Sequence, residues 1–216
     1  TPLVVCDQPK GLDLPFVGID DREAVKPAAR ALLDAGHTRI GILSIRLERT
    51  PHDGPVDKGT LRTAALHVQR ARVLGALEEF TTAGLGDVPV VTRHINDHAN
   101  CRAAAEEMLT THPELTAVLC TTDSMALGVL EYAAARGIAV PEDLSVTGFD
   151  GIRTALIRGL TTVVQPNKEK GRAAGRLLLE LIDAHLADSP PAEPAPREIL
   201  GTTFHPGSTV SAPRAR

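Results

Sequence analysis

Short apolar runs alternate along the chain with longer segments of helical period. The short runs are rich in β-branched residues and show little alternation of apolar and polar positions, which is typical of strands buried on both faces of a sheet. The pattern predicts strands at 3–6, 16–19, 39–44, 88–93, 117–121, 144–149, 161–164 and 198–203. It predicts helices at 22–35, 61–83, 98–111, 123–136 and 167–186. This order of elements predicts an α/β fold with parallel sheets flanked by helices on both faces.

Polar side chains follow several predicted strands at the point where each strand ends. In parallel sheets, ligands bind beyond the carboxyl ends of the strands, so we expect these side chains to share one rim. An arginine on the helix at 61–83 can add a bidentate hydrogen-bond donor. The candidate ligand-binding residues are Asp7, Arg72, Thr122, Asp123 and Asp150. The alternative is that Asp123 only caps its helix and Asp150 only makes a turn.

The composition narrows the classes of partner. Of the 216 residues, 43% are hydrophobic, and the net charge of −4 comes with scattered Lys and Arg. This is a globular mixture without the basic surface of a nucleic-acid-binding domain, so any contact with DNA belongs to a domain absent from this chain. No apolar run approaches the roughly 20 residues of a membrane helix, and the start lacks a signal-peptide pattern. We expect a cytoplasmic protein with no membrane partner.

Neither a metal site nor a disulfide framework is expected. Cys6, Cys101 and Cys120 lie far apart and form no CxxC pair. His94 and His98 are four residues apart and could share a helix face, but no third ligand has a fixed spacing.

The sequence also lacks catalytic machinery. It contains no G-x-S-x-G nucleophile turn and no phosphate-binding loop. The acidic pairs Asp20–Asp21 and Glu78–Glu79 are expected to be solvated or to cap helices. We therefore predict no catalytic residues, no cofactor and no enzyme activity.

Five segments in chain order form a set of motifs. They are AGHTRIG at 35–41, RVLG at 72–75 followed by AGL at 83–85, TDSMALG at 122–128, VPEDLSVTGFD at 140–150, and LTTVVQP at 160–166 followed by GRAA at 171–174. Each is a weak signal, but together they cover most of the chain at plausible spacing, and they resemble the LacI/GalR family of bacterial transcription regulators.

The resemblance implies a periplasmic-binding-protein-like type I sensor with a small-molecule effector in the cleft between two subdomains. The family's regulators are homodimers that bind operator DNA through an N-terminal helix-turn-helix domain. The effector, a sugar or another small polar metabolite, changes their affinity for DNA. On this reading the chain is a fragment of a longer regulator.

By analogy, the two subdomains are represented unequally. Residues 19–163 and 197–212 correspond to a nearly complete C-terminal effector-binding subdomain. Residues 1–18 and 164–190 correspond to a remnant of the N-terminal subdomain, which includes a leucine-rich helix that must pack on something.

The family's effector contacts fall on Asp7, Arg72, Thr122 and Asp150. Some positions depart from the family pattern: Thr122 stands where Asn is usual, Gly151 replaces a frequent Asp, and Ile95 and Asn167 replace frequent aromatics. These changes favour a smaller or more polar effector. The segment 45–69 is also longer than its usual counterpart, which suggests an elaboration on the effector or dimer side.

Two other functions stay open at this point. A solute-binding protein of a sugar transporter shares the fold. A small-molecule enzyme on a doubly wound sheet is the third possibility.

Overall fold

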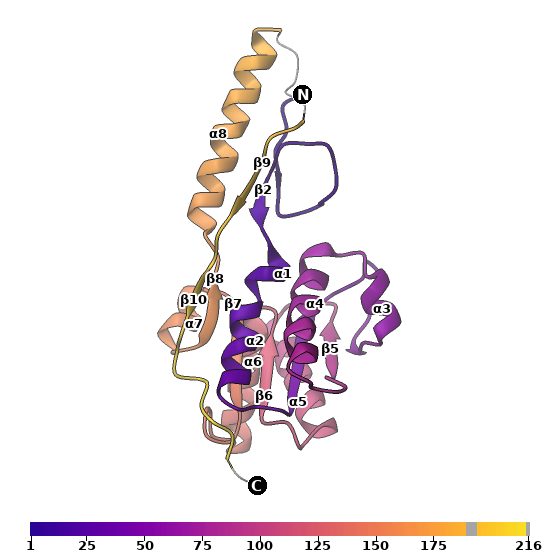
Figure 1. The fold of residues 1–216 in the computed structure, drawn as a ribbon, viewed down its shortest axis with the longest axis vertical. Helices are drawn as coiled ribbons and strands as arrows, with labels where there is room; N and C mark the ends of the chain where they lie inside the picture. Colours follow the sequence, from indigo (N-terminus) through magenta and orange to yellow (C-terminus); the bar gives the residue numbers. More distant parts are fainter. Residues whose placement is uncertain (189–193, 215–216) are drawn as a thin grey trace. The chain divides into compact units, whose positions relative to one another are not determined.

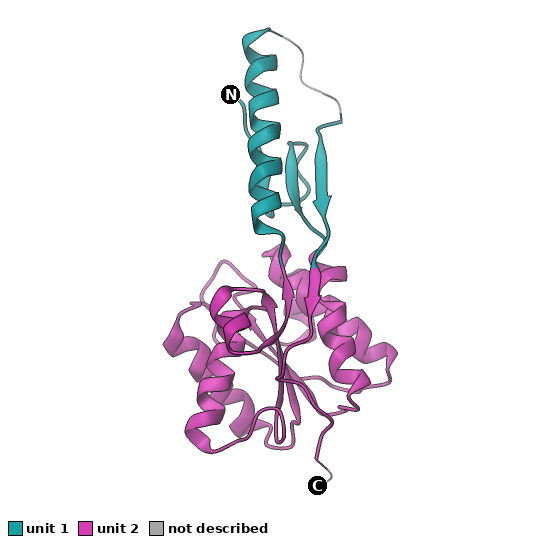
Figure 2. Cartoon of the chain, turned by 90° about the vertical axis from the view of Figure 1, so that its left-hand side faces the viewer, with its two compact units in different colours: residues 1–20, 165–202 teal, residues 21–164, 203–216 magenta. Residues whose placement is uncertain are grey.

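The computed structural model describes residues 1–188 and 194–214. The chain forms two compact units (Figure 2). Unit 1 comprises residues 1–20 and 165–202, and unit 2 comprises residues 21–164 and 203–216. The proline-rich stretch 189–196, which the sequence predicts to be a linker, lies largely outside the described residues. Each unit is described by itself below.

Unit 2 is built on a seven-stranded sheet with the order β10-β8-β7-β6-β3-β5-β4. The five strands from β8 to β5 run parallel, and the edge strands β10 and β4 are antiparallel to their neighbours. The strands are β3 (Ile40–Ile45), β4 (Gly54–Pro55), β5 (Val90–Arg93), β6 (Ala117–Cys120), β7 (Ser145–Asp150), β8 (Thr161–Val164) and β10 (Thr203–His205).

Helices cover both faces of this sheet (Figure 1). On one face α1 (Asp21–Ala24) and α2 (Lys26–Asp34) pack against α4 (His67–Thr82), and on the other α5 (His98–Thr111) packs against α6 (Asp123–Arg136). The central strands are buried except for the last residues of β3 and β7, which explains their largely apolar sequence. The α/β fold with mostly parallel sheets flanked by helices is therefore confirmed.

Local signals set several helix ends. The side chains of Asp97 and Thr122 accept hydrogen bonds from backbone N–H groups in the first turns of α5 and α6. Gly137 ends α6 with a φ of 69°, the left-handed conformation that glycine adopts without strain.

Unit 1 is a three-stranded parallel sheet with the order β1-β2-β9 and one helix, α8. Its elements are β1 (Val5–Cys6), β2 (Phe16–Ile19), α8 (Asn167–Leu186) and β9 (Arg197–Leu200). Val17, Ala173 and Leu177 form its small core. Leu178, Leu179, Ile182 and Leu186 of α8 are exposed, so the contacts within the described residues bury only part of the leucine-rich face.

The structure differs from the sequence prediction at several places. We expected residues 197–212 in the C-terminal subdomain, but β9 pairs with β2 and belongs to unit 1. The helix predicted at 61–83 is two helices, α3 (Lys58–Thr63) and α4. The helix predicted at 22–35 is likewise divided between α1 and α2. The edge strands β4 and β10 and the short helix α7 (Arg153–Ile157) were not predicted.

None of the described helices is long and apolar enough to cross a lipid bilayer.

Candidate functional site

The candidate site of unit 2 is centred on the buried side chain of Arg72, on α4. Its Nε donates to Asp21 Oδ1 at 3.0 Å, and its Nη1 donates to the carbonyl oxygen of Thr121 at 2.8 Å and to Asp150 Oδ1 at 3.4 Å. The guanidinium carbon lies 3.8 Å from the centre of the Phe149 ring, within the range of a cation–π interaction. These contacts hold the guanidinium in one orientation at the carboxyl ends of β6 and β7.

One nitrogen of this guanidinium is left for a ligand. Nη2 of Arg72 makes no hydrogen bond within the described part of the chain, and it is not among the buried unpaired atoms there, so solvent reaches it. An arginine that is fixed by its other nitrogens and open at one is a preorganised donor for a polar ligand.

Asp150 ends β7 in a strained backbone conformation. Its φ is 131°, which non-glycine residues rarely adopt and which costs on the order of 1–3 kcal/mol. Its side chain is half-buried, with 24% of its surface exposed. Such strain concentrates at functional sites, and here it directs the carboxylate to Arg72 while leaving part of it open.

Gly151 fixes the turn that follows. Its φ is 71°, and a Cβ at this position would lie 2.7–2.8 Å from atoms of Val164. The aspartate that the LacI/GalR family frequently carries at the position of Gly151 therefore does not fit this backbone.

Asp123 lies beneath the rim and does not face solvent. It is fully buried, and its carboxylate accepts hydrogen bonds from Thr162 Oγ1 at 2.5 Å and from the backbone N–H of Ile152 at 2.8 Å. Burial raises the pKa of this carboxyl group, and these hydrogen bonds oppose the increase. Gly148 makes room for it, because a Cβ there would lie 2.4 Å from Oδ1. Asp123 therefore supports the loop after Asp150.

Thr122 is buried at the end of β6. Its Oγ1 accepts a hydrogen bond from the backbone N–H of Met125 at 3.3 Å, so its hydroxyl caps α6. The capping role that we weighed for Asp123 belongs to Thr122.

Asp7 lies in unit 1, so the structure does not join it to the residues above. It has a φ of 60° and accepts a hydrogen bond from Lys170 Nζ at 2.8 Å through Oδ2. Lys170 Nζ also donates to Gln165 Oε1 at 2.7 Å. Asp7 Oδ1 is buried and has no partner among the described residues, which leaves an acceptor to be satisfied.

The sequence analysis missed three contributors to the site. Asp21, expected to be solvated or to cap a helix, is buried and pairs with Arg72. Phe149 lies under the same guanidinium. Gln69, one helical turn before Arg72, is buried, and its Oε1 has no hydrogen-bond partner among the described residues. A helical spacing of three residues from Arg72 was the one signal that pointed to Gln69.

The other candidate chemistry does not assemble within the described residues. No group of three or more potential metal-ligating side chains occurs among them. His98 Nε2 contacts Glu131 Oε2, and the backbone N–H of His94 donates to Asp53. All three cysteines are free; Cys101 and Cys120 are buried, whereas Cys6 is exposed instead of filling a core.

The chain was compared with known proteins and solved structures. The periplasmic-binding-protein-like domain family matches residues 29–210. The HTH-type transcriptional regulator IpsA of Corynebacterium glutamicum is 50% identical over 97% of this chain, and an HTH-type transcriptional regulator of Mycobacterium tuberculosis is 41% identical over 98%. The chain spans about 58% of the length of each relative.

Solved structures give the same result. The crystal structure of a LacI-family regulator from Corynebacterium glutamicum matches with a TM-score of 0.89 at 50% identity, over 97% of this chain and 61% of that one. A regulator CelR–cellobiose complex shares the fold with a TM-score of 0.77 at 24% identity, over 95% of this chain and 58% of that one.

These matches define the class of protein. The chain belongs to the periplasmic-binding-protein-like family. Within it, the chain is an effector-binding domain of the LacI-family transcriptional regulators, as its motifs indicate. The relatives are transcriptional regulators and not enzymes, in agreement with the sequence analysis.

Proposed function

We propose that this domain senses a small polar metabolite, a sugar or a molecule of similar polarity, for a cytoplasmic, dimeric LacI-type regulator. Effector binding changes the affinity of the whole protein for operator DNA. The DNA-binding domain lies outside this chain.

The observation that supports the proposal is that the Arg72 guanidinium is held by several partners but keeps one nitrogen, Nη2, without a hydrogen bond among the described residues. A buried arginine is costly unless it is paired, and here Asp21, the Thr121 carbonyl and Phe149 hold it in place. That arrangement leaves Nη2 open beside the partly exposed Asp150. A donor next to an acceptor matches the adjacent hydroxyl groups of a polyol or sugar.

The remaining candidates have unequal roles in this proposal. Arg72 and Asp150 bind the effector directly, and Asp7 stays a candidate from the family resemblance alone. Thr122 and Asp123 position the rim, since their side-chain oxygens are engaged within the protein.

Two relatives support the ligand class. One matched structure is a cellobiose complex, and another is a LacI-family regulator with bound ribose. Both are less than 25% identical to this chain, so they show the shared fold, and the sugar class enters here as a proposal.

A thermal-shift screen of the whole protein tests it. Sugars, sugar phosphates, nucleosides and small carboxylates are added singly, and a ligand of the native state raises the melting temperature by mass action. The hit is then tested for its effect on operator binding. Asp150→Ala should abolish the effector response and leave operator binding without effector intact. A wild-type response in Asp150→Ala would refute the assignment.

The transporter alternative predicts a different result. A solute-binding protein would bind the sugar but would give no operator complex. Any sequence-specific complex with operator DNA therefore excludes it.

A further inference from the structure

Unit 2 contains a cavity that is separate from the Arg72 rim. It has a volume of about 730 Å³, within the range of small-molecule sites. It lies between the segment 55–62, the outer face of α4 and the residues that lead into β5. Arg72, Thr122, Asp123 and Asp150 are not part of its wall.

The long segment 45–69 builds one side of this cavity. β4 pairs with β5 at the edge of the sheet, and the Val56 N–H donates to the Val90 carbonyl at 2.9 Å. α3 follows directly, and residues of α3 and α4 line the same cavity. The elaboration expected from the sequence is thus an ordered wall along the sheet edge.

The interior of the cavity is largely apolar. Leu74 and Leu77, three residues apart on α4, face it together with Val56 and Val88. These four side chains are only half-buried, so the cavity leaves apolar surface in contact with water. Apolar surface of this kind is stabilised when an apolar group covers it.

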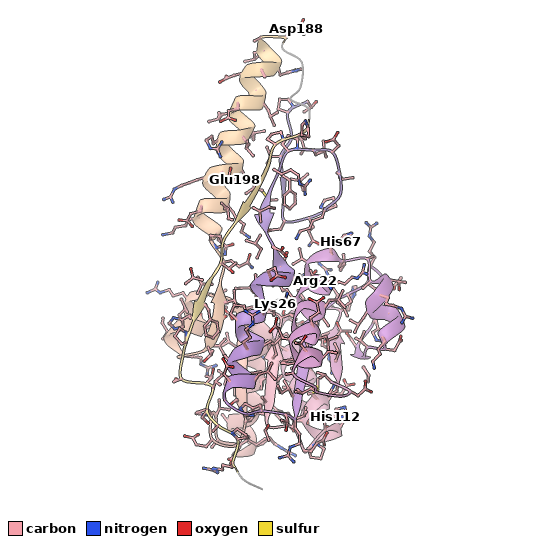
Figure 3. All side chains as sticks on the ribbon, in the orientation of Figure 1. Arg22, Lys26, His67, His112, Asp188 and Glu198 are labelled. Carbon is pink, nitrogen blue, oxygen red and sulfur yellow. The ribbon has the colours of Figure 1, made fainter. Side chains whose placement is uncertain are left out.

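The charges around the cavity leave one cation unmatched. The Asp57 carboxylate caps α3 by accepting hydrogen bonds from the N–H groups of Gly59 and Thr60. Lys58 Nζ pairs with Asp87 at 2.9 Å. His112, labelled in Figure 3 near the end of α5, lies 3.5 Å from Glu114. Arg62 is exposed and has no hydrogen bond or ion pair within residues 1–188 and 194–214.

We propose that this cavity binds a small amphipathic carboxylate, with its hydrocarbon part against Leu74 and Leu77 and its carboxylate paired with Arg62. The shape supplies an apolar interior, and the unmatched guanidinium supplies a bidentate partner for the carboxylate. This site does not depend on the effector site of the proposed function.

Octanoate is the probe, and the test is isothermal titration of the whole protein. Octanoate should bind with one site per chain, and Arg62→Gln should weaken its binding about tenfold, as expected for loss of a charge-assisted hydrogen bond. Arg102→Gln, which alters an exposed arginine on α5, is the matched control and should bind octanoate as the wild type does. The neutral 1-octanol should bind the wild type and Arg62→Gln equally.

A second variant locates the hydrocarbon part. Leu77→Phe fills the cavity and should abolish octanoate binding, whereas Asp150→Asn at the other site should not change it. The proposal is overturned if octanoate does not bind, if Arg62→Gln binds it as tightly as the wild type, or if Asp150→Asn abolishes its binding.

Discussion

At the scale of single residues, the central feature of the site is the buried cation of Arg72. Arg72 has three kinds of partner: the Asp21 carboxylate, the Thr121 carbonyl and the Phe149 ring. Transfer of a guanidinium out of water is unfavourable, and only such a complete set of partners compensates it. Arg72 and Asp150 could be predicted from the sequence because each stands at a recognisable place next to a strand or in a motif. Asp21 could not, since its pairing joins residues 51 positions apart.

Removal of the Arg72 charge should destabilise the fold. Arg72→Met removes the guanidinium that pairs with the buried Asp21 carboxylate, and we expect the free energy of unfolding to fall by about 3–5 kcal/mol in urea denaturation. The double variant Arg72→Met/Asp21→Asn should recover part of this loss. Arg22→Met, which breaks the exposed pair with Glu78, should cost less than about 1 kcal/mol. An equal loss of unfolding free energy in Arg72→Met and Arg22→Met would contradict this account.

Asp123 should prove to be a positioning residue. Asp123→Asn keeps one oxygen for the Ile152 N–H, but its amide N–H₂ replaces the oxygen that accepts from the Thr162 hydroxyl, which must then turn to accept instead of donate. We expect a loss of about 1–3 kcal/mol in unfolding free energy. Asp97→Asn is the control, because asparagine caps a helix as well as aspartate does. If Asp123→Asn is as stable as the control, Asp123 does not support the loop after Asp150.

At the scale of elements, close approach of helices determines where the site residues lie. A Cβ on Gly75 of α4 would lie 2.2 Å from the carbonyl oxygen of Arg22 on α1. This contact brings α1, and with it Asp21, against Arg72. The neighbouring surface is joined by ion pairs from Arg22 and Lys26 to Glu78, with both basic residues labelled in Figure 3.

The sequence predicted most helices and central strands, and its errors have physical causes. Residues 61–83 contain no proline, and Gly75 lies in the interior of α4, so no local signal marks the break after Thr63. The break instead follows from a tertiary hydrogen bond, in which the Leu66 N–H donates to the Leu47 carbonyl. The edge strands β4 and β10 are two and three residues long, too short to show a period.

Gly75→Ala tests the helix contact. The new methyl group forces α1 away from α4, and we expect the unfolding free energy to fall by about 2 kcal/mol or more. Gly171→Ala in α8 meets no atom within 4 Å and should instead stabilise by about 0.5–1 kcal/mol. Calorimetric melting of both variants measures this difference, and a tolerated Gly75→Ala would contradict the packing described here.

The C-terminal segment gives unit 2 a pH dependence. His37 is buried, with Nδ1 2.9 Å from Thr116 Oγ1 and Nε2 2.9 Å from the Ser211 carbonyl. Burial lowers its pKa below the ordinary value near 6.5. The unfolded chain therefore takes up a proton at a pH where the folded protein does not, so stability is complete above about pH 6.5 and falls as the pH drops below it.

The urea midpoint at pH 7.5 and at pH 5.5 measures this effect. The wild type should lose more stability between the two values than His37→Gln, which carries no titrating ring. A decrease of the same size in both proteins would assign the pH dependence to other groups.

At the scale of the whole molecule, the place of β9 was the least predictable feature. The motifs lie mainly in unit 2, where the family match at 29–210 also begins. The pairing of β9 with β2 joins residues about 180 positions apart. Backbone hydrogen bonds hold the two strands together, and because they do not depend on the side chains, the sequence pattern does not predict this pairing. Of the candidate site residues, Arg72, Thr122, Asp123 and Asp150 lie in unit 2, and Asp7 lies in unit 1.

The central claim is that Arg72 and Asp150 bind the effector directly. The measurement that tests it is isothermal titration of the ligand found in the thermal-shift screen into the wild-type protein and Asp150→Asn. Asparagine tolerates the positive φ at this position and keeps the shape, but it removes the charge that pairs with Arg72. We predict an increase in Kd of at least about tenfold with little change in the melting temperature of the free protein. An unchanged Kd in Asp150→Asn would contradict the account.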